Sequence, residues 1–247
     1  MNIAQYLDST YLKTPEQSGM SSEETLQKDK DLAREAIDHG IFAVMIRPDY
    51  VSEIKKYIKE QNSNVAVGTV IGFHEGTYST EEKLNEAEKA IADGADELDF
   101  VINYNAYLKG ELDLVKNEFI ECTQLCMQHD KIAKWIIEIA ALNDTQIADL
   151  TKNISQWAKE YFSENEWPKI FVKSSTGFFE TENGKPNGAT FEGIKIMLDN
   201  ADGLPVKAAG GVRTPEDAEK IISMGVKRIG TSSALALINN KTTQEGY

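Results

Sequence analysis

The sequence predicts an α/β fold, a single-domain (β/α)8 TIM barrel. The chain has 247 residues, close to the roughly 250 of such a barrel. Short apolar segments alternate along it with amphipathic helical segments, and this alternation favours a parallel sheet covered by helices. No linker rich in Ser, Pro or Gly divides the chain. We therefore expect residues 1–238 to form one barrel and residues 239–247 a polar tail.

Eight segments have the character of strands, because they are short and rich in β-branched, aromatic or other apolar residues. The first is brief and the other seven are clear. In chain order they span residues 6–10, 41–46, 65–71, 97–102, 134–139, 169–173, 206–209 and 226–230. An open doubly wound sheet is the alternative, but no G-x-G-x-x-G motif follows an early strand.

Helix signals lie between these strands. Ser79 with Glu82 has the form of a capping box, and Thr214 before Pro215 places a cap ahead of a proline at the first helical position. The predicted helices run from Ser21 to Gly40, from Pro48 past Ile58, from Ser79 to about Gly94, over residues 111–129, from about Thr145 to Phe162, around residues 194–198 and onward from Pro215.

The charge of the chain argues against two classes of partner. Forty acidic and 26 basic residues give a formal net charge of −14, the wrong sign for a nucleic-acid or anionic-membrane binder. Residues 1–20 hold no signal-like apolar core, and no apolar run reaches about 18 residues. We expect a soluble, cytoplasmic protein.

Cysteines and histidines give no sign of a metal site. Cys122 and Cys126 are spaced like packing thiols on one helix. His39, His74 and His129 are scattered without ligand spacing. No metal is therefore expected.

Charged residues interrupt several of the predicted strands. They are Asp8, Asp99, Lys134, Lys173 and Lys207. In a (β/α)8 barrel the chemistry takes place at the carboxyl ends of the strands, so we expect these side chains to meet there. Buried ion pairs are the alternative explanation, yet apolar residues would fill the same space at a lower free-energy cost. Their number favours a functional cluster.

Such a cluster suits amine catalysis by Lys173. A lysine must lose a proton before it attacks a carbonyl, and a nearby ammonium together with partial burial lowers its pKa. Lys207 is the candidate for that ammonium, and Asp99 can work with it to move protons. A Lys173 that extends to solvent or pairs with a carboxylate is the simpler alternative.

Two glycine-containing loops predict a phosphate site. Gly210, Gly211 and Arg213 follow one strand, and Gly230, with Ser232 and Ser233, follows the last. Glycines allow close approach of the backbone, hydroxyls donate, and helix N-termini favour anions. These loops fall after the seventh and eighth strands, where barrels often bind phosphate. Tight turns alone are the alternative explanation.

Five motifs in this order resemble the deoxyribose-phosphate aldolase family, class I aldolases with a (β/α)8 barrel. They are residues 8–13 (DSTYLK), 94–99 (GADELD), 171–178 (FVKSSTGF), 206–213 (VKAAGGVR) and 229–233 (IGTSS). The resemblance extends from about residue 6 to residue 237. It implies reversible cleavage of 2-deoxy-D-ribose 5-phosphate to D-glyceraldehyde 3-phosphate and acetaldehyde, within deoxynucleoside catabolism.

The resemblance also implies roles for individual residues. Lys173 would form the Schiff base with acetaldehyde, Lys207 would lower its pKa, and Asp99 would share the proton relay, supported by Asp8 and Lys134. The residues that match the substrate and phosphate loops are Thr176, Gly177, Gly210, Gly211, Gly230, Ser232 and Ser233. Neither a metal nor an organic cofactor is implied, and homodimers are common in the family.

Some positions depart from the family pattern. Phe178 stands where some members have a phosphate-binding lysine, which shifts phosphate binding toward Arg213, the serines and backbone amides. His74 replaces a usual proline, and we assign it to the loop. Residues 180–189 are expected to form a solvated loop, with a lid as the alternative. Tyr247 matches the terminal tyrosine that assists proton abstraction in some members.

Other functions would leave different signatures. A ketose-bisphosphate aldolase or transaldolase would share the lysine and the phosphate loops but prefer a ketone-derived donor. A barrel that only binds a sugar phosphate would leave the burial of Lys173, Lys207 and Asp99 without an explanation.

Overall fold

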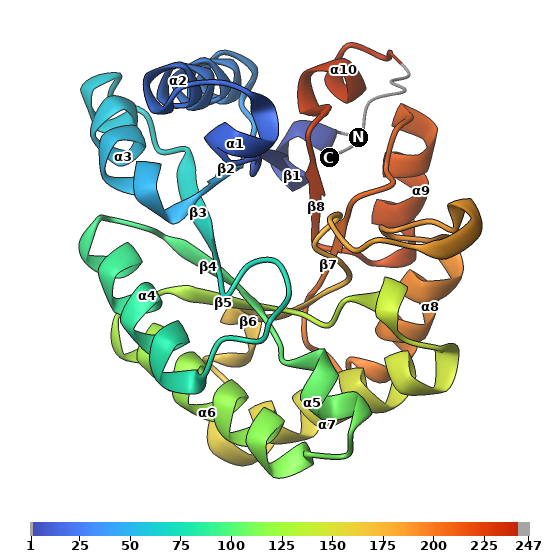
Figure 1. The fold of residues 1–247 in the computed structure, drawn as a ribbon. Helices are drawn as coiled ribbons and strands as arrows, with labels where there is room; N and C mark the ends of the chain where they lie inside the picture. Colours follow the sequence, from blue (N-terminus) through green and yellow to red (C-terminus); the bar gives the residue numbers. More distant parts are fainter. Residues whose placement is uncertain (1, 242–247) are drawn as a thin grey trace.

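The computed structural model of the chain describes residues 2–241, apart from the side chain of Asn183. Eight parallel strands pair in chain order and close into a barrel, with β8 beside β1. Figure 1 shows the strands at the centre with the helices around them. The strands are β1 (Leu7–Thr10), β2 (Ala43–Ile46), β3 (Ala66–Ile71), β4 (Glu97–Val101), β5 (Ile132–Ile136), β6 (Ile170–Lys173), β7 (Val206–Ala209) and β8 (Arg228–Thr231). The predicted fold class is confirmed.

Helices connect successive strands and cover the outside of the barrel. Those in the described part of the chain are α1 (Pro15–Ser18), α2 (Ser22–His39), α3 (Val51–Glu60), α4 (Thr80–Ala92), α5 (Tyr104–Leu108), α6 (Leu112–Gln128), α7 (Asp144–Tyr161), α8 (Phe191–Asn200), α9 (Pro215–Met224) and α10 (Ala234–Ile238). The capping box of Ser79 and Glu82 begins α4 as predicted. Thr214 caps α9, whose first residue is Pro215.

The strands are buried on both faces, and the two faces hold different chemistry. Successive side chains of a strand point to opposite sides. In β4, Phe100 faces the helices and stacks on Trp135 at 4.9 Å between ring centroids, whereas Asp99 faces the barrel interior. Most of the apolar core lies between the barrel and the helices. A separate small cluster, Leu12, Met45 and Val70, lies inside the barrel on the β1 to β3 side.

One strand begins and ends earlier in the chain than predicted. Residues 134–139 were expected to be extended, but β5 begins at Ile132 and ends at Ile136. Glu138 adopts a left-handed conformation with φ of 55°, which ends the strand and starts a 3-10 turn at Ile139. The helix predicted over residues 111–129 is α6, and the short α5 before it was not predicted.

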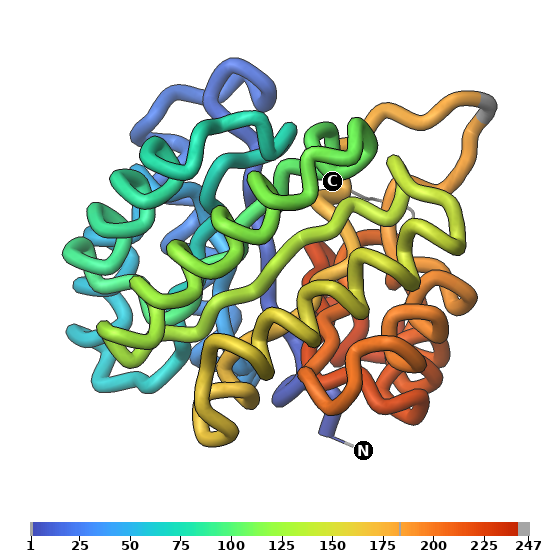
Figure 2. Tube along the Cα trace, turned by 90° about the horizontal axis from the view of Figure 1, so that it is seen from below, coloured from blue at the N-terminus to red at the C-terminus, as the bar shows by residue number. Residues whose placement is uncertain are grey.

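The carboxyl ends of all the strands lie at one end of the barrel, because the strands are parallel and adjacent. Figure 2 shows the orange segment between β6 and α8 projecting beyond the barrel at this end, and the blue start of the described chain at the opposite end. Among the described residues no helix is both long and apolar enough to cross a membrane. The division between a barrel of residues 1–238 and a tail of residues 239–247 stays a prediction, because residues 242–247 lie outside the described part.

Candidate active site

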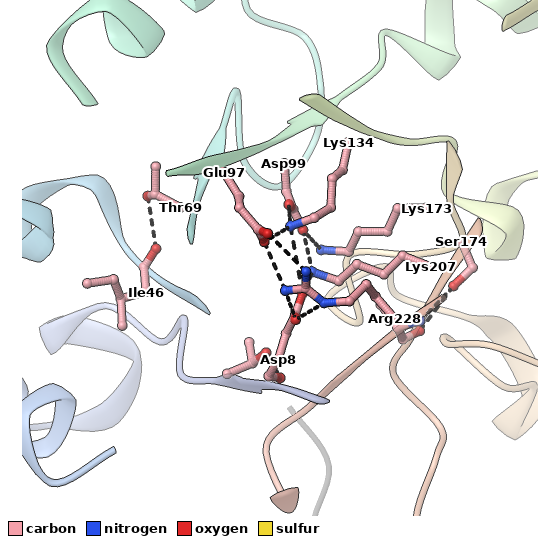
Figure 3. A network of polar contacts seen from close by, with 12 residues as sticks. Asp8, Ile46, Thr69, Glu97, Asp99, Lys134, Lys173, Ser174, Lys207 and Arg228 are labelled. Atoms are coloured by element: carbon pink, nitrogen blue, oxygen red, sulfur yellow. Dashed lines mark hydrogen bonds and ion pairs between the residues drawn. The ribbon is translucent and has the colours of Figure 1, made fainter. Parts of the chain in front are cut away.

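Asp99 lies at the centre of a charged cluster inside the barrel. Its Oδ2 accepts hydrogen bonds from Lys173 Nζ and from Lys207 Nζ, both at 2.7 Å. Its Oδ1 accepts one from Lys134 Nζ at 2.9 Å. Lys173 and Lys207 are direct neighbours in the register of β6 and β7. Figure 3 shows these side chains converging from different strands.

Burial decides the protonation of Lys173. Its side chain is only 5% exposed. Burial disfavours the ammonium form and is the main reason that the pKa of Lys173 falls to about 8. The carboxylate of Asp99 opposes this shift, and the ammonium of Lys207 adds to it. The neutral amine is therefore accessible near physiological pH, with burial contributing more than Lys207.

Lys207 and Asp99 stay charged because neighbouring opposite charges outweigh the effect of burial on their pKa values. Burial disfavours the charged form of Lys207, but Asp8 and Asp99 outweigh it and raise its pKa. Asp8 Oδ2 lies 2.6 Å from Lys207 Nζ. Burial likewise opposes ionisation of Asp99, yet Lys134, Lys173 and Lys207 hold its pKa well below its ordinary value. The cluster thus contains one amine that readily loses its proton beside a fixed cation and a fixed anion.

A second charged layer lies closer to the amino ends of the strands. Arg228, the first residue of β8, donates from Nε to Asp8 Oδ1 at 2.7 Å and from Nη1 to Glu97 Oε1 at 2.9 Å. Lys134 Nζ joins this layer to Asp99 by donating to Glu97 Oε2 at 2.5 Å. These side chains fill the barrel interior below Lys173 and are at most 5% exposed.

Glu138 holds the loop that follows Lys173. Its Oε2 accepts from the backbone N–H of Thr176 at 3.1 Å and also from the Thr176 hydroxyl. Oε1 is buried without a hydrogen-bond partner among the described residues. Burial raises the pKa of Glu138 to about 7, although the bonds from Thr176 and the charge of Lys173 oppose the shift. Hydrogen bonds to Glu138 therefore keep Thr176 buried rather than exposed to solvent.

Hydrogen bonds join the ends of β6, β7 and β8 and the segments that follow β6 and β7. Ser174 Oγ accepts from the Ala209 N–H at 3.0 Å. The Gly210 N–H donates to the Gly230 carbonyl at 3.3 Å, and the Ala189 N–H donates to the Gly210 carbonyl at 3.1 Å. Gly210 and Gly211 both have positive φ, which only glycine adopts readily. The predicted phosphate loops therefore form one connected rim.

The remaining predicted residues occupy different positions on this rim. Gly177 has φ of 81° and its carbonyl accepts from Asn187 Nδ2. Arg213 and Ser232 are exposed. Ser232 and Ser233 line a cavity of about 470 Å³ that also borders Lys13 and Lys28. Tyr247 lies outside the described residues.

Three functional candidates were missed in the sequence: Glu97, Glu138 and Arg228. Each is a charged residue within or directly after an apolar strand. Glu97 and Asp99 lie two residues apart in β4, so their side chains face the same side of the sheet, the barrel interior. This alternation could have identified Glu97 from the sequence. The partners of Arg228 lie 220 and 131 residues away along the chain, and no local pattern indicates such pairs.

Within residues 2–241 no group of three or more His, Cys, Asp or Glu side chains is placed to hold a metal ion. The charged cluster places the Lys173 amine within hydrogen-bonding distance of the Asp99 carboxylate, which also accepts from the Lys207 amine.

Known proteins resemble the chain in both sequence and fold. A family model described as DeoC/LacD family aldolase matches residues 3–240. A deoxyribose-phosphate aldolase from Caldicellulosiruptor saccharolyticus is 37% identical over 239 residues, 96% of this chain and 97% of that protein. One from Thermococcus gammatolerans is 37% identical over 246 residues, 99% of each. The tetrameric deoxyribose phosphate aldolase from Aeropyrum pernix has a TM-score of 0.76 at 28% identity, covering 96% of this chain and 89% of that one.

Proposed function

The chain belongs to the DeoC/LacD family of aldolases, and from this premise we propose that it reversibly cleaves 2-deoxy-D-ribose 5-phosphate to D-glyceraldehyde 3-phosphate and acetaldehyde. The full-length relatives carry the name of this activity. The observation in support is the hydrogen bonding of one carboxylate oxygen, Asp99 Oδ2, to both Lys173 and Lys207. Lys173 is the nucleophile, because its pKa of about 8 makes it the amine most easily deprotonated here.

The reaction balances with the residues of this cluster. Neutral Lys173 Nζ attacks C1 of the open-chain sugar, and uptake of one proton by the departing hydroxyl with loss of water leaves a protonated imine. Removal of the C3 hydroxyl proton then breaks the C2–C3 bond, and the electron pair passes through C2 into the imine as an enamine. Glyceraldehyde 3-phosphate is released. Protonation of C2 and hydrolysis of the imine return acetaldehyde and free Lys173.

Asp99 and Lys207 serve the proton transfers. Asp99 accepts from both amines, so a proton moved to or from the substrate passes along existing hydrogen bonds. Lys207 stays charged and favours the neutral form of Lys173. Asp8 and Lys134 hold Lys207 and Asp99 in place, 2.6 Å and 2.9 Å from them respectively.

The rim of the barrel mouth receives the phosphate. The proposed contacts are backbone N–H groups and side chains of Thr176, Gly177, Gly210, Gly211, Arg213, Gly230, Ser232 and Ser233. Positive φ at Gly177, Gly210 and Gly211 turns the backbone so that its N–H groups can approach an anion. Exposed Arg213 provides the cation.

Three further proposals concern the whole chain. Tyr247 assists proton abstraction, and a chain lacking it would turn over more slowly with unchanged capture of acetaldehyde by Lys173. The chain forms a homodimer in the cytoplasm; the relative from Aeropyrum pernix is a tetramer. Sedimentation equilibrium distinguishes monomer, dimer and tetramer.

Reductive trapping tests the mechanism directly. The protein is incubated with acetaldehyde and cyanoborohydride, digested and mapped by mass spectrometry. We expect the two-carbon adduct on Lys173, and none there in Lys173→Arg. An adduct on another lysine, or bound deoxyribose 5-phosphate without any adduct or turnover, would refute the assignment. Acetone or dihydroxyacetone phosphate outcompeting acetaldehyde as donor would indicate an aldolase with a ketone-derived donor.

A further inference from the structure

Phe178 belongs to the loop after β6, yet it packs against the small apolar cluster inside the barrel. That cluster consists of Leu12, Met45 and Val70. Those residues come from β2, β3 and the segment after β1. In the closed order of eight strands β2 lies opposite β6. Val70 is the register partner of Asp99, so the cluster against which Phe178 packs borders the strand position of the carboxylate that binds Lys173.

Two further rings hold Phe178 in this position. Its ring stacks on His74 with centroids 5.5 Å apart and an interplanar angle of 21°. It meets Phe73 edge-on at 5.0 Å and 78°. At its backbone, the Phe178 N–H donates to Thr176 Oγ1 at 3.0 Å, and Thr176 is held by Glu138. The loops after β3 and β6 thus meet over the mouth through aromatic contacts, which contribute about 0.5–1.5 kcal/mol each beyond their buried area.

Phe178 also borders open space on its other side. A cavity of about 570 Å³ is lined by Lys13, Gly177, Phe178 and Asn187, among others. This volume lies within the roughly 300–1,000 Å³ of small-molecule sites. Lys173, by contrast, is only 5% exposed, and Lys207 and Asp99 are fully buried. Phe178 therefore borders an outer cavity and also packs against the apolar cluster inside the barrel.

We propose that Phe178 is a gate between this outer cavity and Lys173, and that its ring must swing out before an aldehyde or sugar phosphate reaches the amine. This inference deepens the proposed function and rests on it. The closed position excludes water from Lys173 and maintains its burial. The open position removes the ring from Leu12, Met45 and Val70, and leaves an apolar wall beside the amine that suits the methyl group of acetaldehyde.

The gate predicts faster capture of Lys173 when the ring is removed. We expect Phe178→Ala to raise the second-order rate constant for the acetaldehyde adduct about tenfold, because a site open for only a fraction of the time binds more weakly by that fraction. Capture is followed by mass spectrometry with cyanoborohydride over a series of pH values, and the plateau rate constants above the apparent pKa of each variant are compared, so that changed ionisation does not contribute. His74→Ala, which removes the stacked ring, should give a smaller increase.

Two matched variants separate gating from general loosening. Phe179→Ala removes the next ring along the chain, which contacts Tyr104 at 6.2 Å and not the inner cluster; its capture rate should stay within about twofold of the original. Phe178→Leu keeps apolar bulk across the mouth and should restore most of the slow capture. In Phe178→Ala the apparent pKa of capture should also rise, since water replaces the ring near Lys173.

The outcomes distinguish the gate from the proposed function. Equal capture rates in the original protein and in folded Phe178→Ala would refute the gate and leave the aldolase assignment intact. Equal acceleration in Phe178→Ala and Phe179→Ala would also refute it, because general loosening would then suffice. Absence of any Lys173 adduct in every variant would instead refute the proposed function.

Discussion

At the scale of single residues, the central feature is a carboxylate that hydrogen-bonds two amines of opposite character. Lys173 is depressed in pKa by burial, and Lys207 is raised by Asp8 and Asp99. Two lysines 2.7 Å from the same oxygen thus lose their protons at different pH, Lys173 well before Lys207. The difference arises because Lys207 has two carboxylates beside it and Lys173 has one.

The pKa of Lys173 predicts the pH dependence of turnover. Only the neutral amine attacks, so its active fraction grows as pH rises through about 8. We expect kcat/KM for cleavage to rise tenfold per pH unit well below 8 and to level off above it. Lys207→Leu should shift this rise in kcat/KM to higher pH, because it removes a charge that lowers the pKa of Lys173. A profile without change between pH 6 and 9 would contradict the assignment.

Replacing the shared carboxylate tests its role in proton transfer. We expect Asp99→Asn to lower kcat by about 10²–10⁴-fold, the usual contribution of a positioned acid–base group. Asp96→Asn is the control, because Asp96 pairs with Lys55 on the outside of the barrel. Retained kcat in Asp99→Asn, measured with a coupled glyceraldehyde 3-phosphate assay, would exclude Asp99 from the relay.

At the scale of elements, the site depends on how closely the rim loops approach one another. A Cβ added at Gly188 would lie 2.6 Å from the Gly210 carbonyl carbon and 2.9 Å from the Gly211 nitrogen. The segment over residues 180–189, expected to be a solvated loop, is exposed along most of its length but ends against the β7 loop through Ala189.

This close approach predicts a selective defect in phosphate binding. Gly188→Ala must push the backbone of Gly210 and Gly211 aside, so we expect KM for deoxyribose 5-phosphate to rise about tenfold or more. Capture of acetaldehyde by Lys173 should change little, because the lysine lies on β6. Gly184→Ala is the matched control, since nothing lies within 4 Å of its added Cβ. Equal KM values for the two variants would show that the phosphate does not bind at Gly210 and Gly211.

Element boundaries show where sequence patterns stop being informative. The apolar run 134–139 correctly indicated a strand but not where the strand begins and ends. Ile137 and Ile139 remain buried although the chain has left the sheet by Glu138, so burial alone does not mark the end of the strand. The capping signals at Ser79 and Thr214 were local, and both helices begin there. Asp99, Lys173 and Lys207 were predictable because each interrupts an apolar strand. The packing of Phe178 against the inner apolar cluster was not predictable, since it depends on barrel closure.

At the scale of the whole molecule, the barrel interior is charged differently from its surface. The chain carries a formal charge of −14, whereas inside the barrel Asp8, Glu97 and Asp99 face Lys134, Lys173, Lys207 and Arg228. Loss of the proton from Lys173 leaves these formal charges balanced. Such an interior costs stability relative to an apolar one, which supports a functional reason for it.

The lower charged layer makes the fold sensitive to one side chain. Arg228→Met leaves Asp8 and Glu97 without their guanidinium partner, and breaking a buried pair costs about 3–5 kcal/mol. We expect the urea midpoint to fall accordingly at pH 7. Lys227→Met, at the exposed neighbouring position, should stay within about 0.5 kcal/mol of the original protein. Similar midpoints for both variants would show that this layer contributes little to folding.

The same layer has a kinetic consequence. Because Asp8, Glu97 and Arg228 fill the barrel on the amino-end side of Lys173, we expect reactants to approach the amine from the carboxyl ends of the strands. During cleavage the two-carbon fragment stays bonded to Lys173 while the phosphorylated aldehyde lies nearer the entrance. The products must then depart in a fixed sequence, glyceraldehyde 3-phosphate before acetaldehyde. In the synthetic direction, excess glyceraldehyde 3-phosphate would block the path of acetaldehyde and produce substrate inhibition.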